Sequence, residues 1–348
     1  MSKSGCSAFD PRCWRGFQAA PRLDLLHFCV LLLALVVLAP VSEAQQPKGG
    51  PSSEYELIEL PLRPLAVSNS QWVSGTTSDQ KAARWSARAG LERIPLPSEF
   101  TLSEGLAVNL NGDTVGTAST ADSSRRAGFV FRDGTASLLP GEQASAEDIN
   151  DSGEIVGQAR LAGKKAVGPA LWRKTGPLDL GICCAGTARR INGAGLIVGD
   201  TYDSDGHYHA FLWTAAQGAK RLDQSGEGYS SVVALNARGT VLLRSTPAAL
   251  WLYAAGRFTP LNAPQATPRA MNNDEVVVGS FGAKLEGQRA FVWDKTGGMR
   301  DLNALIPPDS GWTLEVATGI NDRGEIVGWG DHRGVENAGF LLRPRDQR

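Results

Sequence analysis

The sequence predicts an all-β protein that closes into a ring, a seven-bladed β-propeller, with a β-solenoid or a β-sandwich as the alternative. Three observations lead to this fold class. A turn motif occurs seven times, a second landmark follows each turn by about 20 residues, and the first strand-like segment has no nearby partner in the sequence. Units of about 42 residues with four short strands have the size of a propeller blade.

The turn motif is clearest at residues 149–157, Ile-Asn-Asp-Ser-Gly-Glu-Ile-Val-Gly, and residues 320–328 repeat it almost unchanged. The Asn side chain starts a tight hairpin, and the first Gly adopts the left-handed conformation at little steric cost. The second Gly should allow a neighbouring strand to approach closely. We expect a structural role for the recurring positions, which are Asn109, Asn150, Asn192, Asn236, Asn272, Asn321, Gly157, Gly199, Gly279 and Gly328.

Two units depart from this motif. Ser68 stands at the Asn position of the first unit, and Leu243 replaces the second Gly of the fifth. The spacings between the Asn-type positions are 41, 41, 42, 44, 36 and 49 residues. This steady period favours one continuous array of repeats.

The second landmark is a short apolar segment, such as Ala210-Phe211-Leu212-Trp213. β-Branched and aromatic residues bounded by Gly are typical of strands. Because the landmark keeps the phase of the turns, its Trp residues are expected to form core between blades. These residues are Trp172, Trp213, Trp251 and Trp293.

The two ends of the repeat region complement each other. The seventh unit stops at Leu342-Arg343-Pro344 without a final strand, whereas Tyr55 to Leu60 form an alternating strand before the first turn. Placing that strand beside Gly339 to Leu342 would complete the last blade from both ends. A ring closed in this way hides the strand edges that an open stack exposes.

The first 44 residues have the pattern of a signal peptide. A positively charged segment precedes an apolar run of 15 residues, Leu25 to Ala39, and Ser42-Glu43-Ala44 offers a cleavage site. The run is short for a membrane-spanning helix, which needs about 20 residues. We expect cleavage after Ala44, a flexible linker at 45–53 and a single propeller domain at 54–348. The protein would then be secreted or periplasmic, with no stable membrane span.

Charge and cysteine content exclude further classes. Lys and Arg total 35 against 36 for Asp and Glu, so no charge excess exists to attract nucleic acid. Residues 45–348 contain two Cys, Cys183 and Cys184, which rules out a disulfide framework. The adjacent pair could close a vicinal disulfide or be two small loop residues.

The two landmarks together resemble the HAF family of extracellular repeats, named after a His-Ala-Phe tripeptide that stands here as His209-Ala210-Phe211. The resemblance covers about residues 65–344. It implies a secreted, mainly bacterial protein without an assigned common activity. His occurs in one unit, and Arg289 and Pro169 take its position in two others.

Motifs for enzymatic chemistry are mostly missing. The sequence has no Gly-x-Ser-x-Gly elbow, no His-Glu-x-x-His helix, no phosphate-binding loop and no Cys-x-x-Cys pair. His207 and His209 could begin a metal site, and residues 203–206 resemble part of a calcium loop, but both lack further ligands. Acidic residues such as Glu154 and Glu325 recur in phase, which favours turn structure over catalysis. We therefore expect no cofactor, no metal and no catalytic residue.

The segments between the second and third strands of each unit vary freely, and we expect them to share one face with the connections between blades. Binding residues collect on loops held by a rigid scaffold. The candidate binding residues are Arg125, Arg126, Tyr202, Tyr208, Trp329 and His332.

These features favour a secreted, monomeric, non-catalytic scaffold for an extracellular ligand, a carbohydrate or a protein. The alternatives are a hydrolase or lyase that acts on extracellular polymers, and a structural surface protein.

Overall fold

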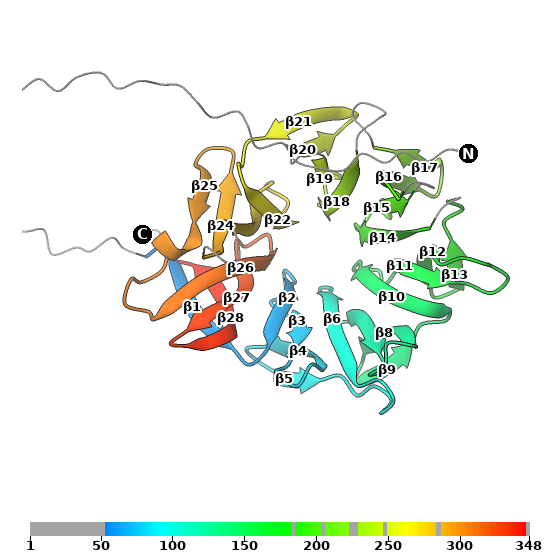
Figure 1. The fold of residues 1–348 in the computed structure, drawn as a ribbon, viewed down its shortest axis with the longest axis horizontal. Coiled ribbons are helices and arrows are strands. Elements are labelled where there is room, and N and C mark those ends of the chain that lie inside the picture. The colour runs from blue at the N-terminus through cyan, green and yellow to red at the C-terminus, as the bar shows by residue number, and fades with distance from the viewer. Residues whose placement is uncertain are drawn as a thin grey trace, which may run out of the picture. The chain divides into compact units, whose positions relative to one another are not determined.

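The computed structural model describes residues 53–182, 185–202, 206–222, 229–245, 249–282 and 287–345. In this part of the chain, seven four-stranded antiparallel sheets stand as blades around a common centre (Figure 1). The predicted fold class, an all-β seven-bladed propeller, is confirmed. The predicted signal peptide, the linker up to residue 52, the Cys pair and residues 203–205 lie outside the described residues.

The first three blades follow one another along the chain, each from its innermost to its outermost strand. Blade 1 contains β2 (Arg63–Val67), β3 (Val73–Thr76), β4 (Ala82–Ser86) and β5 (Gly90–Arg93). Blade 2 contains β6 (Leu102–Val108), β7 (Thr114–Ser119), β8 (Arg126–Arg132) and β9 (Thr135–Leu138). Blade 3 contains β10 (Glu142–Ile149), β11 (Ile155–Arg160), β12 (Gly168–Arg173) and β13 (Gly176–Asp179).

The next three blades have the same order of strands. Blade 4 contains β14 (Gly186–Ile191), β15 (Ile197–Tyr202), β16 (Tyr208–Thr214) and β17 (Gly218–Arg221). Blade 5 contains β18 (Ser230–Leu235), β19 (Val241–Ser245), β20 (Ala249–Ala254) and β21 (Arg257–Leu261). Blade 6 contains β22 (Ala266–Met271), β23 (Val277–Phe281), β24 (Arg289–Asp294) and β25 (Gly298–Asp301), and the 3-10 turn η2 (Leu302–Ala304) follows it.

Blade 7 is built from both ends of the described chain. Its three inner strands are β26 (Trp312–Ile320), β27 (Ile326–His332) and β28 (Val335–Pro344), and its outer strand is β1 (Tyr55–Leu60). β1 pairs antiparallel with β28, from Tyr55 opposite Pro344 to Leu60 opposite Gly339. The closure predicted from the orphan strand is confirmed.

The hydrophobic core is divided among the interfaces between neighbouring blades, with one cluster at each of the seven. An apolar side chain near the end of each third strand packs against the preceding blade. Trp172, Trp213 and Trp293 hold this position and are 4%, 6% and 8% exposed. Their predicted role as core between blades is confirmed.

Trp251 packs, partly buried, against the cluster between blades 4 and 5, but it does not hold the corresponding position in blade 5. The strand register places Tyr253 opposite Val241, as Trp213 lies opposite Ile197, whereas Trp251 lies opposite Leu243. Tyr253 is buried, and Trp251 is half-buried with its indole N–H donated to the Ser245 hydroxyl at 3.0 Å. The tetrapeptide of this blade is therefore Leu250 to Tyr253, which lies two residues later than the sequence comparison placed it.

The second Gly of the turn motif makes room for the inner strand, as predicted. A Cβ atom on Gly157 would lie 1.9 Å from the Ser145 carbonyl oxygen, and one on Gly328 would lie 2.1 Å from that of Val316. Gly199 and Gly279 are equally close to Thr187 and Thr267. A side chain at these positions would separate the first two strands.

Each inner strand also has a register shift at the same place, next to this close contact. The extra residues are Leu65, Leu106, Glu147, Arg189, Val233, Arg269 and Thr318. A residue at such a β-bulge is unpaired in the ladder, and the bulge redirects its side chain. We refer to these seven residues as the bulge positions.

Candidate functional site at the mouth of the central channel

The two faces of the ring carry different connections. Because the strands of a blade are antiparallel and in chain order, the Asn turns between first and second strands all lie on one face, which we call the turn face. The loops between second and third strands lie on the opposite face with the connections between blades. We call this opposite face the loop face.

On the turn face, the recurring Asn side chains join the blades to one another. Asn150 Nδ2 donates to the carbonyl oxygen of Asn192 at 3.2 Å, and Asn192 Nδ2 donates to that of Asn236 at 3.2 Å. The same bond links Asn109 to Asn150, Asn236 to Asn272, Asn272 to Asn321 and Asn321 to Ser68. Each Asn Oδ1 meanwhile accepts backbone N–H groups of its own turn, as Asn192 does from Ala194 and Leu196.

The seventh junction differs because Ser68 is too short to reach the next blade. Ser70 Oγ bridges this junction instead and donates to the Leu110 carbonyl oxygen at 2.7 Å. The sequence predicted the role of Asn within its turn, but the bonds between blades were not predicted. They explain why the chain uses Asn, an acceptor and a donor in one side chain, at this position.

The in-phase carboxylates have structural roles as well. Glu154 accepts from Asn150 Nδ2 at 3.0 Å and pairs with Arg173 at 2.7 Å. Glu325 likewise accepts from Asn321 and Gln71 and pairs with Arg343. Burial acts to raise the pKa of Glu325, but these hydrogen bonds and the Arg343 charge together hold it below its usual value.

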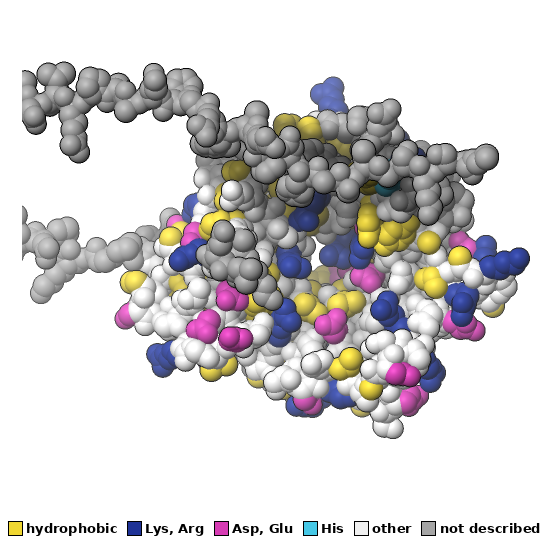
Figure 2. All heavy atoms as spheres, viewed as in Figure 1, with side chains coloured by type: hydrophobic (Ala, Val, Ile, Leu, Met, Phe, Trp, Pro, Cys, Tyr) yellow, Lys and Arg dark blue, Asp and Glu magenta, His cyan; other side chains and the backbone are white. Residues whose placement is uncertain are grey.

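The loop face contains a cavity of about 1110 Å³, which we call the mouth cavity. It is lined by inner strands of blades 1 to 3, by nearby loops and by the β1 and β28 ends of blade 7. Figure 2 shows a hollow at the centre of the ring with Lys and Arg side chains around it and a few Asp and Glu between them. The polar lining residues are Glu59, Arg63, Thr76, Thr77, Ser78, Gln80, Ser103, Glu104, Thr117, Ser119, Arg126, Ser145, Glu147, Glu336 and Asn337.

Three sets of equivalent strand positions supply much of this wall. The first set lies on inner strands just before the close contact and includes Arg63, Glu104 and Ser145. The bulge positions supply Leu106 and Glu147. The third set lies on second strands, opposite the first, and includes Thr76 and Thr117. Residue type varies from blade to blade at all three sets, in contrast to the Asn turns.

A hydrogen-bonded chain of side chains crosses the cavity wall between blades 2 and 3. The Thr117 and Ser145 hydroxyls lie 2.8 Å apart, and Ser145 Oγ donates to Glu147 Oε1 at 2.6 Å. Thr76 Oγ1 is buried without a hydrogen-bond partner among the described residues. The wall therefore carries hydroxyl and carboxylate groups, and Gln80 and Asn337 add amides.

The six candidate binding residues are divided among three blades rather than gathered in one place. Arg126 lines the mouth cavity. Arg125 and Arg126 both line a smaller hollow of about 410 Å³. The Arg125 guanidinium pairs with Glu99 at 3.3 Å and lies over the Phe100 ring. Tyr202 and Tyr208 pack edge to face in blade 4, with ring centres 4.6 Å apart, and neither lines the cavity.

Trp329 and His332 lie in blade 7, one layer behind the cavity wall. The Arg63 guanidinium lies 4.5 Å from the centre of the Trp329 ring. His332 stacks on Trp312, with ring centres 4.5 Å apart, and its Nδ1 lies 3.1 Å from Glu59 Oε2. Both candidates are half-buried and each contacts a cavity residue, so they position Arg63 and Glu59.

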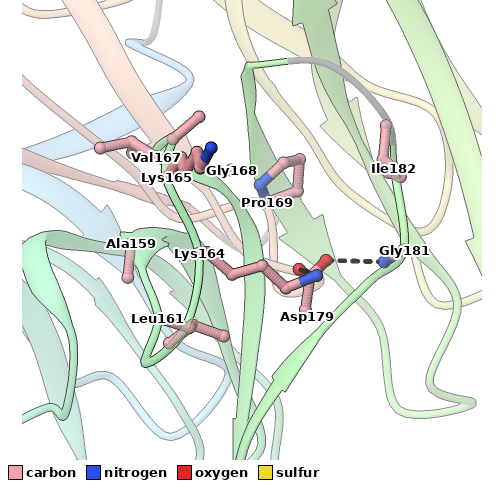
Figure 3. Close-up of a pocket in the computed structure, with 11 residues that line it drawn as sticks. Ala159, Leu161, Lys164, Lys165, Val167, Gly168, Pro169, Asp179, Gly181 and Ile182 are labelled. Carbon is pink, nitrogen blue, oxygen red and sulfur yellow. Dashed lines mark hydrogen bonds and ion pairs between the residues drawn. The ribbon is translucent and has the colours of Figure 1, made fainter.

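A third hollow of about 370 Å³ lies on blade 3 (Figure 3). Lys164 extends across it to Asp179, with Nζ 2.7 Å from Oδ2, and the Gly181 N–H donates to the same carboxylate at 2.8 Å (Figure 3). The pKa of Asp179 lies below its usual value, because these two donors outweigh the effect of burial. Since Lys164 is neutralised, this hollow is a weaker candidate than the mouth cavity.

No group of three or more His, Cys, Asp or Glu side chains in the described ranges is arranged to hold a metal ion. Over the same ranges, no helix has the length and apolar character needed to cross a membrane.

No family model and no curated protein sequence matches the chain. Solved β-propellers match its fold. A streptogramin B lyase has a TM-score of 0.55 and 11% identity, covering 84% of this chain and 98% of that one. YCF48 bound to D1 peptide has a TM-score of 0.54 and 13% identity, covering 84% and 97%. The β-propeller domain of the trilobed protease from Pyrococcus furiosus, which has an open velcro topology, has a TM-score of 0.54 and 10% identity, covering 85% and 95%. At these identities the likeness shows the fold alone, and this fold serves both binding proteins and enzymes.

Proposed function

We propose that this protein is a secreted, non-catalytic binding scaffold of HAF-type repeats, and that its ligand, a carbohydrate or a protein segment, binds in the mouth cavity. The observation that carries the proposal is the contrast between polar residues that keep the repeat phase and those that do not. Asn turns and in-phase carboxylates are engaged in bonds within and between blades. The residues that vary from blade to blade line a polar cavity of about 1110 Å³.

The size and lining of the cavity support a ligand larger than a metal ion. Small-molecule sites usually measure about 300–1,000 Å³, and this cavity is open at its mouth to the loops of several blades. Its hydroxyl and amide groups match the hydrogen-bonding pattern of sugars and of peptide backbone. Secretion is supported by the charge and apolar pattern of residues 1–44.

A blocking variant tests this proposal. Ser78 is exposed at the cavity rim, so Ser78→Trp would fill part of the mouth without disturbing the core. We expect the purified protein to be retained on a glycan or protein array and Ser78→Trp to lose that retention. Ala216→Trp, an exposed change in the turn between β16 and β17, serves as the control and should keep it.

Two results would contradict the proposal. Equal retention of wild type and Ser78→Trp would place the binding surface elsewhere. Turnover of a chromogenic polysaccharide or peptide substrate that Glu104→Gln abolishes would show an enzyme instead, because Glu104 is a cavity carboxylate available for acid–base chemistry.

A further inference from the structure

The positions that line the mouth cavity in blades 1 to 3 have equivalents in blades 5 and 6, and these equivalents are arginines. Arg269 is the bulge residue of β22, and corresponds to the cavity residues Leu106 and Glu147. Arg244 of β19 pairs with Ser231 and corresponds to the cavity residue Thr76, which pairs with Arg63. Both side chains are exposed, and their backbone positions on β19 and β22 match those of the cavity residues around the ring.

Charges at these positions are separated by sign around the ring. Blades 2 and 3 provide Glu104 and Glu147, which form an acidic arc. Blades 5, 6 and 1 provide Arg244, Arg269 and Arg63, which we call the basic arc. Blade 4 lies between the arcs and contributes a neutral pair, Arg189 with Asp200 at 3.0 Å.

Among the residues that the structure describes, no carboxylate pairs with an arginine of the basic arc. Within the described part of the chain, neither Arg244 nor Arg269 has an ion pair or a side-chain hydrogen bond, and both are exposed. Arg63 is held against the Trp329 ring rather than by a carboxylate. In blade 7, β26 carries the half-buried Glu315 at a second register shift.

The arginines also interact with one another. Partial desolvation of its guanidinium group, and then the positive charges of Arg63 and Arg244, hold the pKa of Arg269 below its usual value, although much of the side chain is exposed. Arg189, which has Asp200 beside it, shows the opposite. Burial alone would lower the pKa of Arg189, but the hydrogen bond and the negative charge of Asp200 outweigh burial and raise the pKa above its usual value. Repulsion among like charges that remain in the folded state is relieved by an anion between them.

We propose that the basic arc binds an oxyanion group of the ligand, a carboxylate, sulfate or phosphate, through the guanidinium groups of Arg63, Arg244 and Arg269. The planar guanidinium donates two parallel hydrogen bonds to such a group. This inference rests on the proposed function and gives its ligand a negative charge. An acidic sugar or an acidic protein segment would then lie with its charged end on blades 5, 6 and 1 and its hydroxyl or amide groups over blades 2 and 3.

Inorganic probes test the basic arc without knowledge of the natural ligand. Sodium sulfate, phosphate and acetate are titrated separately into the full chain at pH 7, with ionic strength held constant by sodium chloride. We expect a saturable increase in Tm and saturable heat of binding with at least one of the three. A response to acetate would assign a carboxylate, and a response to sulfate or phosphate alone would assign a tetrahedral oxyanion.

Variants connect the effect to the arc. Arg269→Gln and Arg63→Gln should each raise the Kd of the probe at least tenfold, while their Tm without probe stays the same or rises because repulsion is removed. Arg238→Gln on the turn face, where the side chain is 66% exposed and paired with Asp274, should leave the Kd unchanged. No saturable response, or an equal response in all variants, would overturn the inference.

The outcome can be separated from that of the proposed function. Suppose that the wild type is retained on the array, that Ser78→Trp abolishes this retention, and that no anion raises Tm or gives heat of binding. This result would refute anion binding by the basic arc and would leave the scaffold function supported. A probe response lost in Arg269→Gln, without retention on any glycan or protein array, would support the arc and refute the scaffold function.

Discussion

The turn face and the loop face are built from the same seven repeats, yet they differ in how strictly they keep the repeat sequence. Six of seven turns place Asn at the same position, and each of these Asn residues bonds to the next blade. At the cavity positions of the loop face, the same repeats carry Arg63, Glu104 and Ser145. A position that joins blades must satisfy the same geometry seven times, whereas a position facing a ligand needs to suit one ligand.

Disrupting blade 7 should have the largest effect on both faces, because the turn face and the loop face both depend on a closed ring. Deleting residues 53–60 would remove β1, with Tyr55 and Leu60 buried and Leu57 and Ile58 half-buried, and would expose the edge of β28. Burial of such side chains contributes about 1.5–3 kcal/mol each, against about 5–15 kcal/mol for a whole domain. We expect loss of cooperative thermal unfolding by circular dichroism. Deletion of residues 45–52 is the control, and a cooperative melt of the β1 deletion near the wild-type Tm would refute closure by β1.

Trp213 and Tyr208 compare the two kinds of position within one strand, β16. Trp213 packs in the cluster between blades 3 and 4, whereas Tyr208 is 43% exposed. Trp213→Ala should lower the free energy of unfolding by about 3–5 kcal/mol through a cavity, and Tyr208→Ala by less than about 0.5 kcal/mol. Urea unfolding measures both values. The reverse ranking would show that repeat phase does not identify the core.

Asp148 tests the contacts between blades through pH. It accepts the Ile191 N–H of the next blade at 3.0 Å, and burial raises its pKa to about 6 from 3.8, although Arg190 acts to lower it. The folded state therefore holds the proton more tightly than the unfolded state. This group's stabilising contribution is complete below about pH 4 and is lost as pH rises through about 6, by up to about 3 kcal/mol.

Asp148→Asn should flatten the dependence of Tm on pH between 4 and 7, and the exposed Asp309→Asn should not. A pH profile that Asp148→Asn leaves unchanged would mean that another group governs it.

Ser68 offers the smallest expected effect and sharpens the account of the turn face. Ser68→Asn would supply the missing side chain at the seventh junction, with its amide directed at the Asn109 carbonyl oxygen. One added hydrogen bond typically contributes about 0.5–1.5 kcal/mol, so the free energy of unfolding should rise by that amount in urea titrations. Destabilisation would show that the Ser70 bridge to Leu110 is the better solution at this junction.

The fold could be predicted from the sequence because its signals recur seven times, and even the orphan strand at Tyr55 to Leu60 identified its partner. The predicted alignment of blade 5 with the other repeats was wrong. Its second strand has Leu243 where the other blades have Gly, and Trp251 was therefore matched to the position that Tyr253 holds. The hydrogen bonds between blades at Asn192 and its equivalents could not be predicted. They depend on distances between neighbouring blades, which the order of residues in a repeat does not give.

The candidate site was predicted in part, for a physical reason. The prediction favoured variable loops, and of its residues Arg126 lines the cavity while Trp329 and His332 lie behind the cavity wall. Most of the wall comes instead from strand positions that keep the repeat phase but change residue type, such as Arg63 and Glu104. Aligning the seven units and looking for changes of charge at fixed positions would have found these residues.

We propose that one face holds the ring together and the other binds the ligand, and two variants measured in two ways test this division most directly. Asn192→Ala removes the bond to Asn236 and two turn bonds, and Ser78→Trp fills the cavity rim. Unfolding free energy and array retention are measured for both. We expect Asn192→Ala to lose about 1–3 kcal/mol of unfolding free energy and to keep retention, whereas Ser78→Trp should keep its stability and lose retention. Loss of retention in a folded Asn192→Ala, with retention intact in Ser78→Trp, would contradict it.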